Sequence, residues 1–250
     1  MSLRFLVDEP ALLIQEKKIL VISDLHLGYE IELYENGIMI PTQFQRFRDQ
    51  IEKLKEETKA TTLVILGDLK HKVPGIKFRE IREIPKFLEF LKENFKVLLI
   101  KGNHDTEIET ILPKGIKLYP ASGFSIGKYG FFHGSSWPHS RLISCDFVFM
   151  GHLHPVVEFR DDIGYRNIER IWVKSKLDTK KIQEKYKIKK LGELNLIIVP
   201  AFNRLMGGLA LNRSKPRDLL GPLLSSRTID IDESEAFLLD GTELGKIGSL

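Results

Sequence analysis

Cysteine is nearly absent from the sequence: Cys145 is the one example among 250 residues. A single thiol cannot form an internal disulfide, which excludes a disulfide-stapled secreted domain and favours a reducing compartment. Long apolar runs are lacking as well, and Asp8, Glu9 and Pro10 interrupt the first apolar stretch, where a signal peptide would need it unbroken. We therefore expect a cytoplasmic protein without a membrane partner. Cys145 opens an apolar segment and is expected in the core.

The chain also lacks a strong excess of charge. Its formal net charge is +4, and its 42% hydrophobic and 29% charged residues are typical of a soluble protein. The length suits one large domain with its own core, predicted to span residues 1–250. The most charged segment, residues 166–190, holds ten Lys or Arg against three acidic residues. This segment favours either contact with a phosphate backbone or an ordinary solvated face, and the sequence leaves both open.

Hydrophobic periodicity predicts an α/β fold. Thr42 and Gln45 have the spacing of a capping box, and they precede a helix to about residue 58 whose apolar face carries Phe44, Phe47, Ile51 and Leu54. A second helical pattern covers residues 78–94, and short strand patterns follow residue 116. We expect a four-layer α-β-β-α sandwich of two packed mixed sheets. Residues 203–228, rich in Gly, Pro, Ser and Arg, are expected to form a long loop or flap.

Aspartate and histidine gather where apolar segments end. The apolar run at residues 63–66 stops at Gly67, so Asp68 lies at the C-terminal tip of a predicted buried strand. In layered α/β folds ligands collect at that edge, because strand ends deliver side chains onto short loops over a rigid floor. Four other apolar segments end in the same way, at Asp24 and His26, at Asn103 and His104, at His133, and at His152 and His154. Five such endings in one chain predict a metal site.

The ligand types indicate which metals and which chemistry. Imidazole and carboxylate together suit Mn, Fe, Zn and Ni, and the lack of thiol ligands argues against a structural zinc site. Two cations about 3.5–4 Å apart can neutralise a phosphate ester, hold it for in-line displacement and activate a water for attack. Such a site needs one shared carboxylate, and Asp68 is the candidate.

The five motifs resemble, in order, the signature blocks of the calcineurin-like metallophosphoesterases: Asp-x-His, Gly-Asp, Gly-Asn-His-Asp, His-Gly and Gly-His-x-His. The resemblance runs from Asp24 to His154, somewhat over half of the chain, and it also implies the four-layer sandwich. It implies two divalent metal ions, with manganese first among the candidates. One ion would be held by Asp24, His26, Asp68 and His154, and the other by Asp68, Asn103, His133 and His152. The whole chain is further similar to small archaeal phosphoesterases related to a bacterial phosphoesterase associated with DNA ligase.

His104 is the candidate for protonating the leaving oxygen, because the reaction needs a proton donor that does not bind metal. Its neighbour Asp105 either orients His104 or caps the helix that follows, and capping is favoured.

His71 lies three residues after Asp68, where phosphomonoesterases of the superfamily usually carry Asp. The form Gly-Asp-Leu-x-His resembles the exonuclease branch, in which the additional histidine contacts the phosphate that is cut. The resemblance implies that His71 and Asn103 bind the substrate phosphate. Lys70, Lys72 and Lys101 would then lie close enough to neutralise the phosphates of nucleic-acid strands. Alternatively, His71 merely packs a loop. Cationic side chains of the predicted flap are further candidates for phosphate contact: Arg204, Arg213 and Arg217.

The interpretation with most support is a phosphodiesterase that uses metal-activated water, with DNA or RNA as the leading substrate. A small-molecule phosphodiesterase or a pyrophosphatase acting on a nucleotide is the alternative enzyme, favoured by the lack of a long extra domain that could clamp DNA. A non-catalytic scaffold is the third hypothesis, and the full set of ligand residues argues against it.

Overall fold

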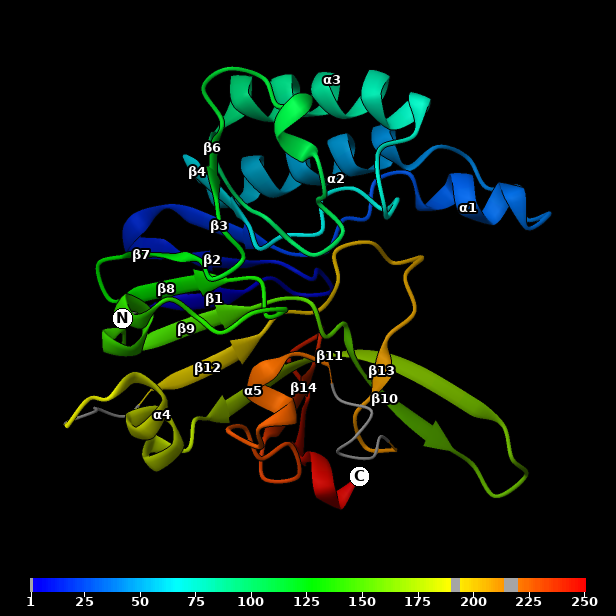
Figure 1. The fold of residues 1–250 in the computed structure, drawn as a ribbon. Helices are drawn as coiled ribbons and strands as arrows, with labels where there is room; N and C mark the ends of the chain where they lie inside the picture. The colour runs from blue at the N-terminus through cyan, green and yellow to red at the C-terminus, as the bar shows by residue number, and fades with distance from the viewer. Residues whose placement is uncertain (1, 190–193, 214–219) are drawn as a thin grey trace.

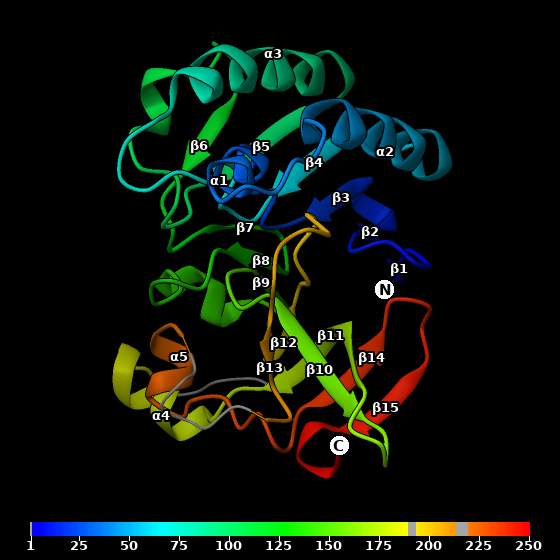
Figure 2. The same ribbon diagram turned by 90° about the vertical axis from the view of Figure 1, so that its right-hand side faces the viewer.

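The computed structural model describes residues 2–189, 194–213 and 220–250. Two mixed β-sheets pack face to face, and helices lie on the outer surface of each sheet (Figures 1 and 2). The predicted α/β sandwich of two mixed sheets is confirmed. None of the described helices is both long enough and apolar enough to cross a membrane. Cys145 is buried and carries a free thiol.

The first sheet holds the strands that follow the N-terminus. Its first three strands run antiparallel, and the pairs from β3 to β6 are parallel. Every residue of β3 is buried, as expected for a strand covered on both faces. The strands lie in the order β1 (Leu3–Phe5), β2 (Leu12–Ile14), β3 (Ile19–Ile22), β4 (Thr62–Ile65), β5 (Lys96–Ile100) and β6 (Lys117–Tyr119).

Three helices belong to the first half of the chain: α1 (Tyr29–Glu35), α2 (Gln43–Thr58) and α3 (Phe78–Asn94). The predicted apolar face of α2 is buried, and it packs with α3 against the first sheet. The predicted capping box does not form, because the Thr42 hydroxyl donates to Glu30 Oε1, 3.3 Å away, and makes no cap hydrogen bond. This contact ties the start of α2 to α1.

The second sheet is larger and more mixed. Its strands β10 and β11 form a long antiparallel hairpin that projects from the body of the molecule (Figure 1). The main path runs β13 (Leu209–Ala210), β10 (Pro155–Arg160), β11 (Arg166–Lys176), β12 (Asn195–Ile198), β9 (Phe147–Met150), β8 (Tyr129–Phe132) and β7 (Phe124–Ile126). A side branch joins β11 to β14 (Glu235–Leu238) and then to β15 (Glu243–Lys246).

The outer face of the second sheet is covered by two short helices, α4 (Thr179–Tyr186) and α5 (Pro222–Ser225). Ile182, Leu223 and Leu224 attach them to the sheet. The segment 203–228 contains β13 and α5, while residues 214–219, with Arg217, lie outside the described residues. In the basic segment, residues 166–176 form β11 and residues 179–186 form α4, and Lys190 lies outside the described residues.

An apolar layer between the two sheets holds them together. Val21, Val64 and Leu98 from the first sheet meet Phe131 and Phe149 from the second. The rings of Phe131 and Phe149 stack with centroids 5.4 Å apart. Burying an aromatic or aliphatic side chain of this size contributes about 1.5–3 kcal/mol. This layer fixes the sheets so that the C-terminal ends of β3, β4, β5, β8 and β9 meet at one edge.

Candidate metal centre

Asp68 lies at the meeting point of the strand ends, three residues after the end of β4. Its Oδ2 atom is 3.7 Å from Nε2 of His26 and 3.5 Å from Nε2 of His133. His26 follows a strand of the first sheet and His133 a strand of the second, so one carboxylate oxygen faces imidazoles from both sheets. This is the position that a carboxylate shared by two cations would need.

Three groups of possible ligand atoms lie around Asp68: one joins His26 with His71 and His104, and the other two consist of predicted metal ligands alone. Asp24, His26 and His154 form the first of these two groups, and Asp68, His133 and His152 form the second, with the ligand atoms of each group within 4.8 Å of one another. In the first group His154 Nε2 lies 3.4 Å from Asp24 Oδ1 and 3.2 Å from His26 Nε2. Beside the second group, Asn103 Oδ1 lies 3.0 Å from His133 Nε2. The structure thus brings together all seven residues predicted as metal ligands.

The backbone at these residues is strained. A positive φ angle, which side chains other than glycine rarely adopt, occurs at five of the seven: Asp24 (54°), His26 (44°), Asp68 (48°), His152 (71°) and His154 (46°). Conformations of this kind cost about 1–3 kcal/mol each and cluster where function needs a particular side-chain direction. The strain turns successive side chains of each loop toward a common point.

Two motif glycines leave the space that Asp68 and His133 occupy. A Cβ atom on Gly102 would lie 2.1 Å from Asp68 Oδ1, and one on Gly67 would lie 2.5 Å from His133 Nδ1. Gly67 also has a φ of 114°, in the region that favours glycine. Glycine at these positions therefore permits the close packing of the loops.

The charges of the cluster depend on one another. Burial alone would raise the pKa of Asp24, but the charge and hydrogen bond of His154 lower it below its usual range. Burial would lower the pKa of His133, but the hydrogen bond and charge of Asp68 raise it to about 9. Burial lowers the pKa of His152 to about 4. The buried carboxylates of Asp24 and Asp68 need positive charge beside them if they are to stay ionised. Divalent metal ions could supply that charge in place of the imidazole protons, and the oxygen and nitrogen donors of the cluster fit such ions.

The match to a protein family covers these motifs. A family model described as calcineurin-like phosphoesterase matches residues 17–189, which include all five strand-end motifs and the seven clustered residues. The chain belongs to the calcineurin-like phosphoesterase family. As a phosphoesterase it is a hydrolase that acts on phosphoester bonds. None of the curated proteins compared with the chain matches it.

The chain is similar to several solved structures, one of which supports its fold. Nuclease MPE of Pseudomonas putida is 20% identical with a TM-score of 0.57, and the match covers 95% of this chain and 90% of that one. Yfce, a phosphoesterase from E. coli, is 14% identical with a TM-score of 0.43, covering 91% and 97%. A predicted phosphoesterase from Streptococcus pneumoniae TIGR4 is 13% identical with a TM-score of 0.31, covering 90% and 91%. The similarity to the first shows that the two proteins share a fold.

His104 is held by its Nδ1 atom in the phosphoesterase site. This atom lies 2.6 Å from the backbone carbonyl of His71, which accepts an N–H hydrogen bond. The backbone N–H of His104 also donates to Asp68 Oδ1, at 2.8 Å. The proton of His104 is thereby placed on Nδ1, and Nε2 is the ring atom left to exchange a proton. The sequence did not indicate the His71 carbonyl as the group that orients His104.

Both ring nitrogens of His71 face other side chains. Nε2 lies 3.0 Å from Glu32 Oε2 on α1, and Nδ1 lies 3.3 Å from His26 Nδ1. Both ring nitrogens of His71 are therefore engaged within the protein, and its expected contact with the scissile phosphate stays a prediction. His71 also does more than pack a loop, because its ring contacts both Glu32 and His26. Glu32 was missed in the sequence because it is one of three glutamates on α1 and belongs to no motif.

Asp105 does not cap the helix that follows, and its expected role in orienting His104 stays a prediction. Its side chain accepts hydrogen bonds from the backbone N–H groups of Gly102, at 2.8 Å, and Lys70, at 3.1 Å. The short helix that follows begins after Glu107. Asp105 therefore links the loops after β4 and β5, and burial together with the charge of Asp68 raises its pKa to about 6.

Lys70 and Arg204 are both engaged within the protein, and their expected phosphate contacts stay predictions. Lys70 is fully buried, and its Nζ donates to the Gly75 carbonyl, at 2.8 Å, and to the Thr106 hydroxyl, at 3.3 Å. Arg204 donates to the carbonyl of Asp8 and lies 3.6 Å from Glu9. These contacts depend on loop conformations, so the sequence did not reveal that the two cations hold the protein itself together.

Two further polar residues support the centre. The Ser23 hydroxyl donates to Asp24 Oδ2 at 2.6 Å, and the Asn203 amide donates to the Leu25 carbonyl at 2.9 Å. Both side chains are fully buried. Ser23 could have been suspected from its place directly before Asp24, whereas Asn203 lies 178 residues from its partner.

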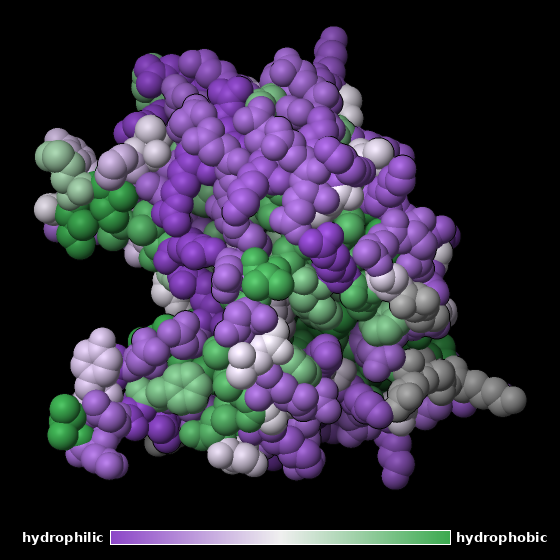
Figure 3. Space-filling model, turned by 180° about the vertical axis from the view of Figure 1, so that it is seen from behind, coloured by the Kyte–Doolittle hydropathy of each residue, from purple (hydrophilic) through white to green (hydrophobic). Residues whose placement is uncertain are grey.

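The surface is hollowed between the end that carries α1 and the projecting β10–β11 hairpin (Figure 3). Both elements adjoin the centre, because Glu32 of α1 contacts His71 and β10 begins directly after His154. The rims carry exposed apolar side chains, among them Tyr34 and Met39 on one side and Ile163 and Tyr165 on the other. A substrate that reaches the centre from this side would pass between the two rims.

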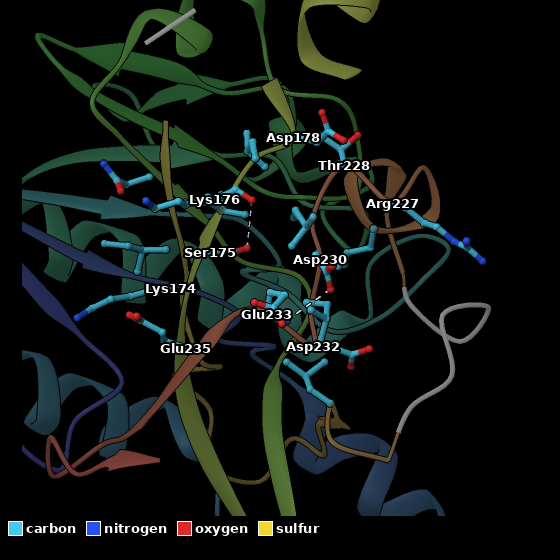
Figure 4. Close-up of a pocket in the computed structure, with 18 of the residues that line it drawn as sticks. Lys174, Ser175, Lys176, Asp178, Arg227, Thr228, Asp230, Asp232, Glu233 and Glu235 are labelled. Atoms are coloured by element: carbon cyan, nitrogen blue, oxygen red, sulfur yellow. Dashed lines mark hydrogen bonds between the residues drawn. The ribbon is translucent and has the colours of Figure 1, made fainter. Parts of the chain in front are cut away.

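A separate cavity of about 1230 Å³ lies between β1, β11, β12 and residues 227–235 (Figure 4). None of the seven clustered residues lines it. Asp178 accepts hydrogen bonds from Lys180 and Lys181 as the cap of α4, and Asp230 accepts one from the backbone of Glu233. Two of the acidic side chains of this cavity are therefore engaged in local hydrogen bonds, and the candidate site is the strand-end cluster.

Proposed function

We propose that this phosphoesterase is a two-metal phosphodiesterase whose substrate is a nucleic-acid strand. The carrying observation is the position of Asp68 Oδ2 between His26 and His133, which come from different sheets. Asp24, His26, Asp68 and His154 would hold one ion, with Asp68 shared. The other ion would be held by Asp68, Asn103, His133 and His152.

Manganese suits the mixture of carboxylate, amide and imidazole donors, and iron, zinc and nickel are the alternatives. When bound, two such cations would neutralise the phosphate and activate the attacking water. Asn103 is proposed to contact the phosphate as well. His104, with its proton on Nδ1 held by the His71 carbonyl, would present Nε2 to protonate the leaving oxygen.

Three observations support a nucleic-acid substrate. The Gly-Asp-Leu-x-His block resembles the exonuclease branch of the superfamily, and the fold is shared with a solved structure whose name is nuclease MPE. The hollow between α1 and the hairpin gives an extended molecule room to reach the centre (Figure 3).

A cytoplasmic location remains a prediction from the low cysteine content.

A small-molecule phosphodiesterase is the second candidate. It is favoured because several Arg and Lys side chains are engaged in hydrogen bonds within the protein. Arg170 donates to the carbonyl of Met206 at 2.9 Å, and Lys181 donates to that of Arg227 at 2.7 Å. Lys70 and Arg204 are likewise engaged within the protein. Cations occupied in this way do not provide the series of phosphate contacts that binding to a long strand needs.

A substrate panel tests the proposal. The purified protein with Mn²⁺ is expected to hydrolyse bis(p-nitrophenyl) phosphate, single-stranded DNA and double-stranded DNA or RNA at measurable rates. Hydrolysis of mononucleotide diesters with none of any polynucleotide would favour the second candidate. A protein that binds Mn²⁺ and hydrolyses no phosphodiester would contradict both candidates.

A matched pair of histidine variants separates the centre from the rest of the protein. His133→Ala is expected to abolish hydrolysis, because it removes a proposed ligand. His139→Ala is the control, since His139 lies outside the five motifs and only caps a short helix through Arg141. Equal activity of the two variants would contradict the proposed centre.

A further inference from the structure

His26 presents its two ring nitrogens to different partners. Nε2 faces the proposed metal position, 3.7 Å from Asp68 Oδ2 and 3.2 Å from His154 Nε2. Nδ1 points the other way and lies 3.3 Å from Nδ1 of His71. If Nε2 binds a metal ion, the proton of the neutral imidazole must be on Nδ1, where it can be donated only to an atom with a free electron pair.

His71 can accept that proton in only one tautomer. Its Nδ1 must carry the free electron pair, so its own proton must lie on Nε2. That atom is 3.0 Å from Glu32 Oε2, a carboxylate oxygen that accepts hydrogen bonds and donates none. Glu32 therefore selects the tautomer of His71 that His26 requires.

The three side chains run from the interior to the surface. The exposed fraction of the side chain is 1% for His26, 11% for His71 and 50% for Glu32. The backbone of His71 is fixed separately, because its N–H donates to the Leu27 carbonyl at 2.9 Å. Removing Glu32 would therefore release the ring of His71 without releasing its backbone or the carbonyl that holds His104.

We propose that Glu32 is a positioning residue, which acts through His71 to fix the tautomer and orientation of the metal ligand His26. The inference rests on the proposed two-metal function. Partners that hold the second nitrogen of a ligating histidine typically change metal affinity about 10–100-fold when they are removed. This assigns a role to an exposed residue of α1 that lies outside the five motifs.

Mn²⁺ titration of the full-length metal-free protein, followed by electron paramagnetic resonance, tests the inference. Glu32→Ala is expected to weaken one of the two Mn²⁺ sites at least about tenfold. Glu32→Gln should show a smaller loss, because its amide oxygen can still accept the hydrogen bond without the charge. Glu32 is half-exposed on a helix, where alanine favours the helical state, so both variants should fold.

Glu35→Ala is the matched control. Glu35 lies on the same helix, its side chain is 58% exposed, and it anchors α1 through an ion pair of 2.6 Å to Lys77. If Glu32 only attached α1 to the protein, the two alanine variants would lose Mn²⁺ affinity equally. Such equality, or a Glu32→Ala affinity within twofold of the wild type, would overturn the inference.

Two measurements locate the effect at His71. His71→Ala should weaken Mn²⁺ binding as much as Glu32→Ala, and the double variant should be no weaker than His71→Ala, because the two act in series. Additive losses of Mn²⁺ affinity in the double variant would contradict the inference that Glu32 acts through His71. In the Zn²⁺-loaded protein, ¹⁵N NMR should show His71 protonated on Nε2, and protonation on Nδ1 would contradict it. These readouts do not require turnover, so they distinguish failure of this inference from failure of the proposed function.

Discussion

Asp68 combines two tasks in one side chain. Oδ2 faces imidazoles from both sheets, while Oδ1 accepts the backbone N–H of His104. The side chain that would be shared by the two cations therefore also positions the loop of the proposed proton donor. A change at Asp68 should affect metal binding and the placement of His104 together.

Asp68→Asn keeps the size of the side chain and removes its charge. Charge stabilisation by a bound metal is worth several kcal/mol, and each 1.4 kcal/mol is tenfold in rate. We expect at least about a 100-fold loss of kcat with bis(p-nitrophenyl) phosphate. The variant should also contain less bound Mn²⁺ than the wild type. Wild-type kcat and metal content in this variant would show that Asp68 is not shared.

His104→Asn should act on proton transfer without removing metal. General acid catalysis contributes about 10²–10⁴-fold, and the contribution matters most when the leaving group is a poor one. We expect a large loss of kcat on a dinucleotide, a much smaller loss on bis(p-nitrophenyl) phosphate, and unchanged Mn²⁺ content. Equal losses on both substrates would argue against a proton-donating role.

The loops after the strands are packed more tightly than their sequences reveal. Gly102 and Gly67 leave room for Asp68 and His133, and Asp105 joins the loops after β4 and β5 through two backbone hydrogen bonds. The geometry of the centre is therefore a property of several loops packed together. A small change of shape in one loop should reach ligands in another.

Gly102→Ala tests this packing. Its Cβ would lie 2.1 Å from Asp68 Oδ1, so the two loops must separate, at a cost of about 1–3 kcal/mol. We expect a lower melting temperature and reduced Mn²⁺ content. Gly207→Ala is the control, because a Cβ there meets no atom within 4 Å. If both variants bind Mn²⁺ equally, the close approach at Gly102 is unimportant.

The centre joins the two sheets. Asp24, His26, Asp68 and Asn103 follow strands of the first sheet, whereas His133, His152 and His154 follow strands of the second. Ions held by both sets would add a direct link to the apolar layer that already holds the sheets together. Metal binding should therefore stabilise the whole fold.

Mn²⁺ is expected to raise the melting temperature of the wild-type protein. At a free concentration of 100 times Kd, one site stabilises the folded state by about 2.7 kcal/mol if the unfolded chain does not bind. Differential scanning calorimetry with and without chelator measures the shift. The shift should shrink in Asp68→Asn, and an unchanged shift in that variant would place the bound ions elsewhere.

The order of elements and the identity of the clustered residues were readable along the chain. Apolar runs that stop at glycine predicted buried strands, and the residues after those runs are the ones that meet in the structure. The buried face of α2 was equally predictable from its periodicity. These features succeed because strand and helix patterns depend on neighbours within a few residues.

The partner of each polar side chain could not be read in this way. The sequence suggested a helix cap for Thr42, and the structure directs its hydroxyl to Glu30 instead. Nor did the sequence reveal that Lys70 contacts the Gly75 carbonyl or that His71 contacts Glu32. The motifs themselves determined which chemical groups reach the edge of the sheets, because covalent adjacency carries them there. Only the packing of one sheet against the other decided which groups face one another, since hydrogen bonds between distant loops require both ends to be held in place.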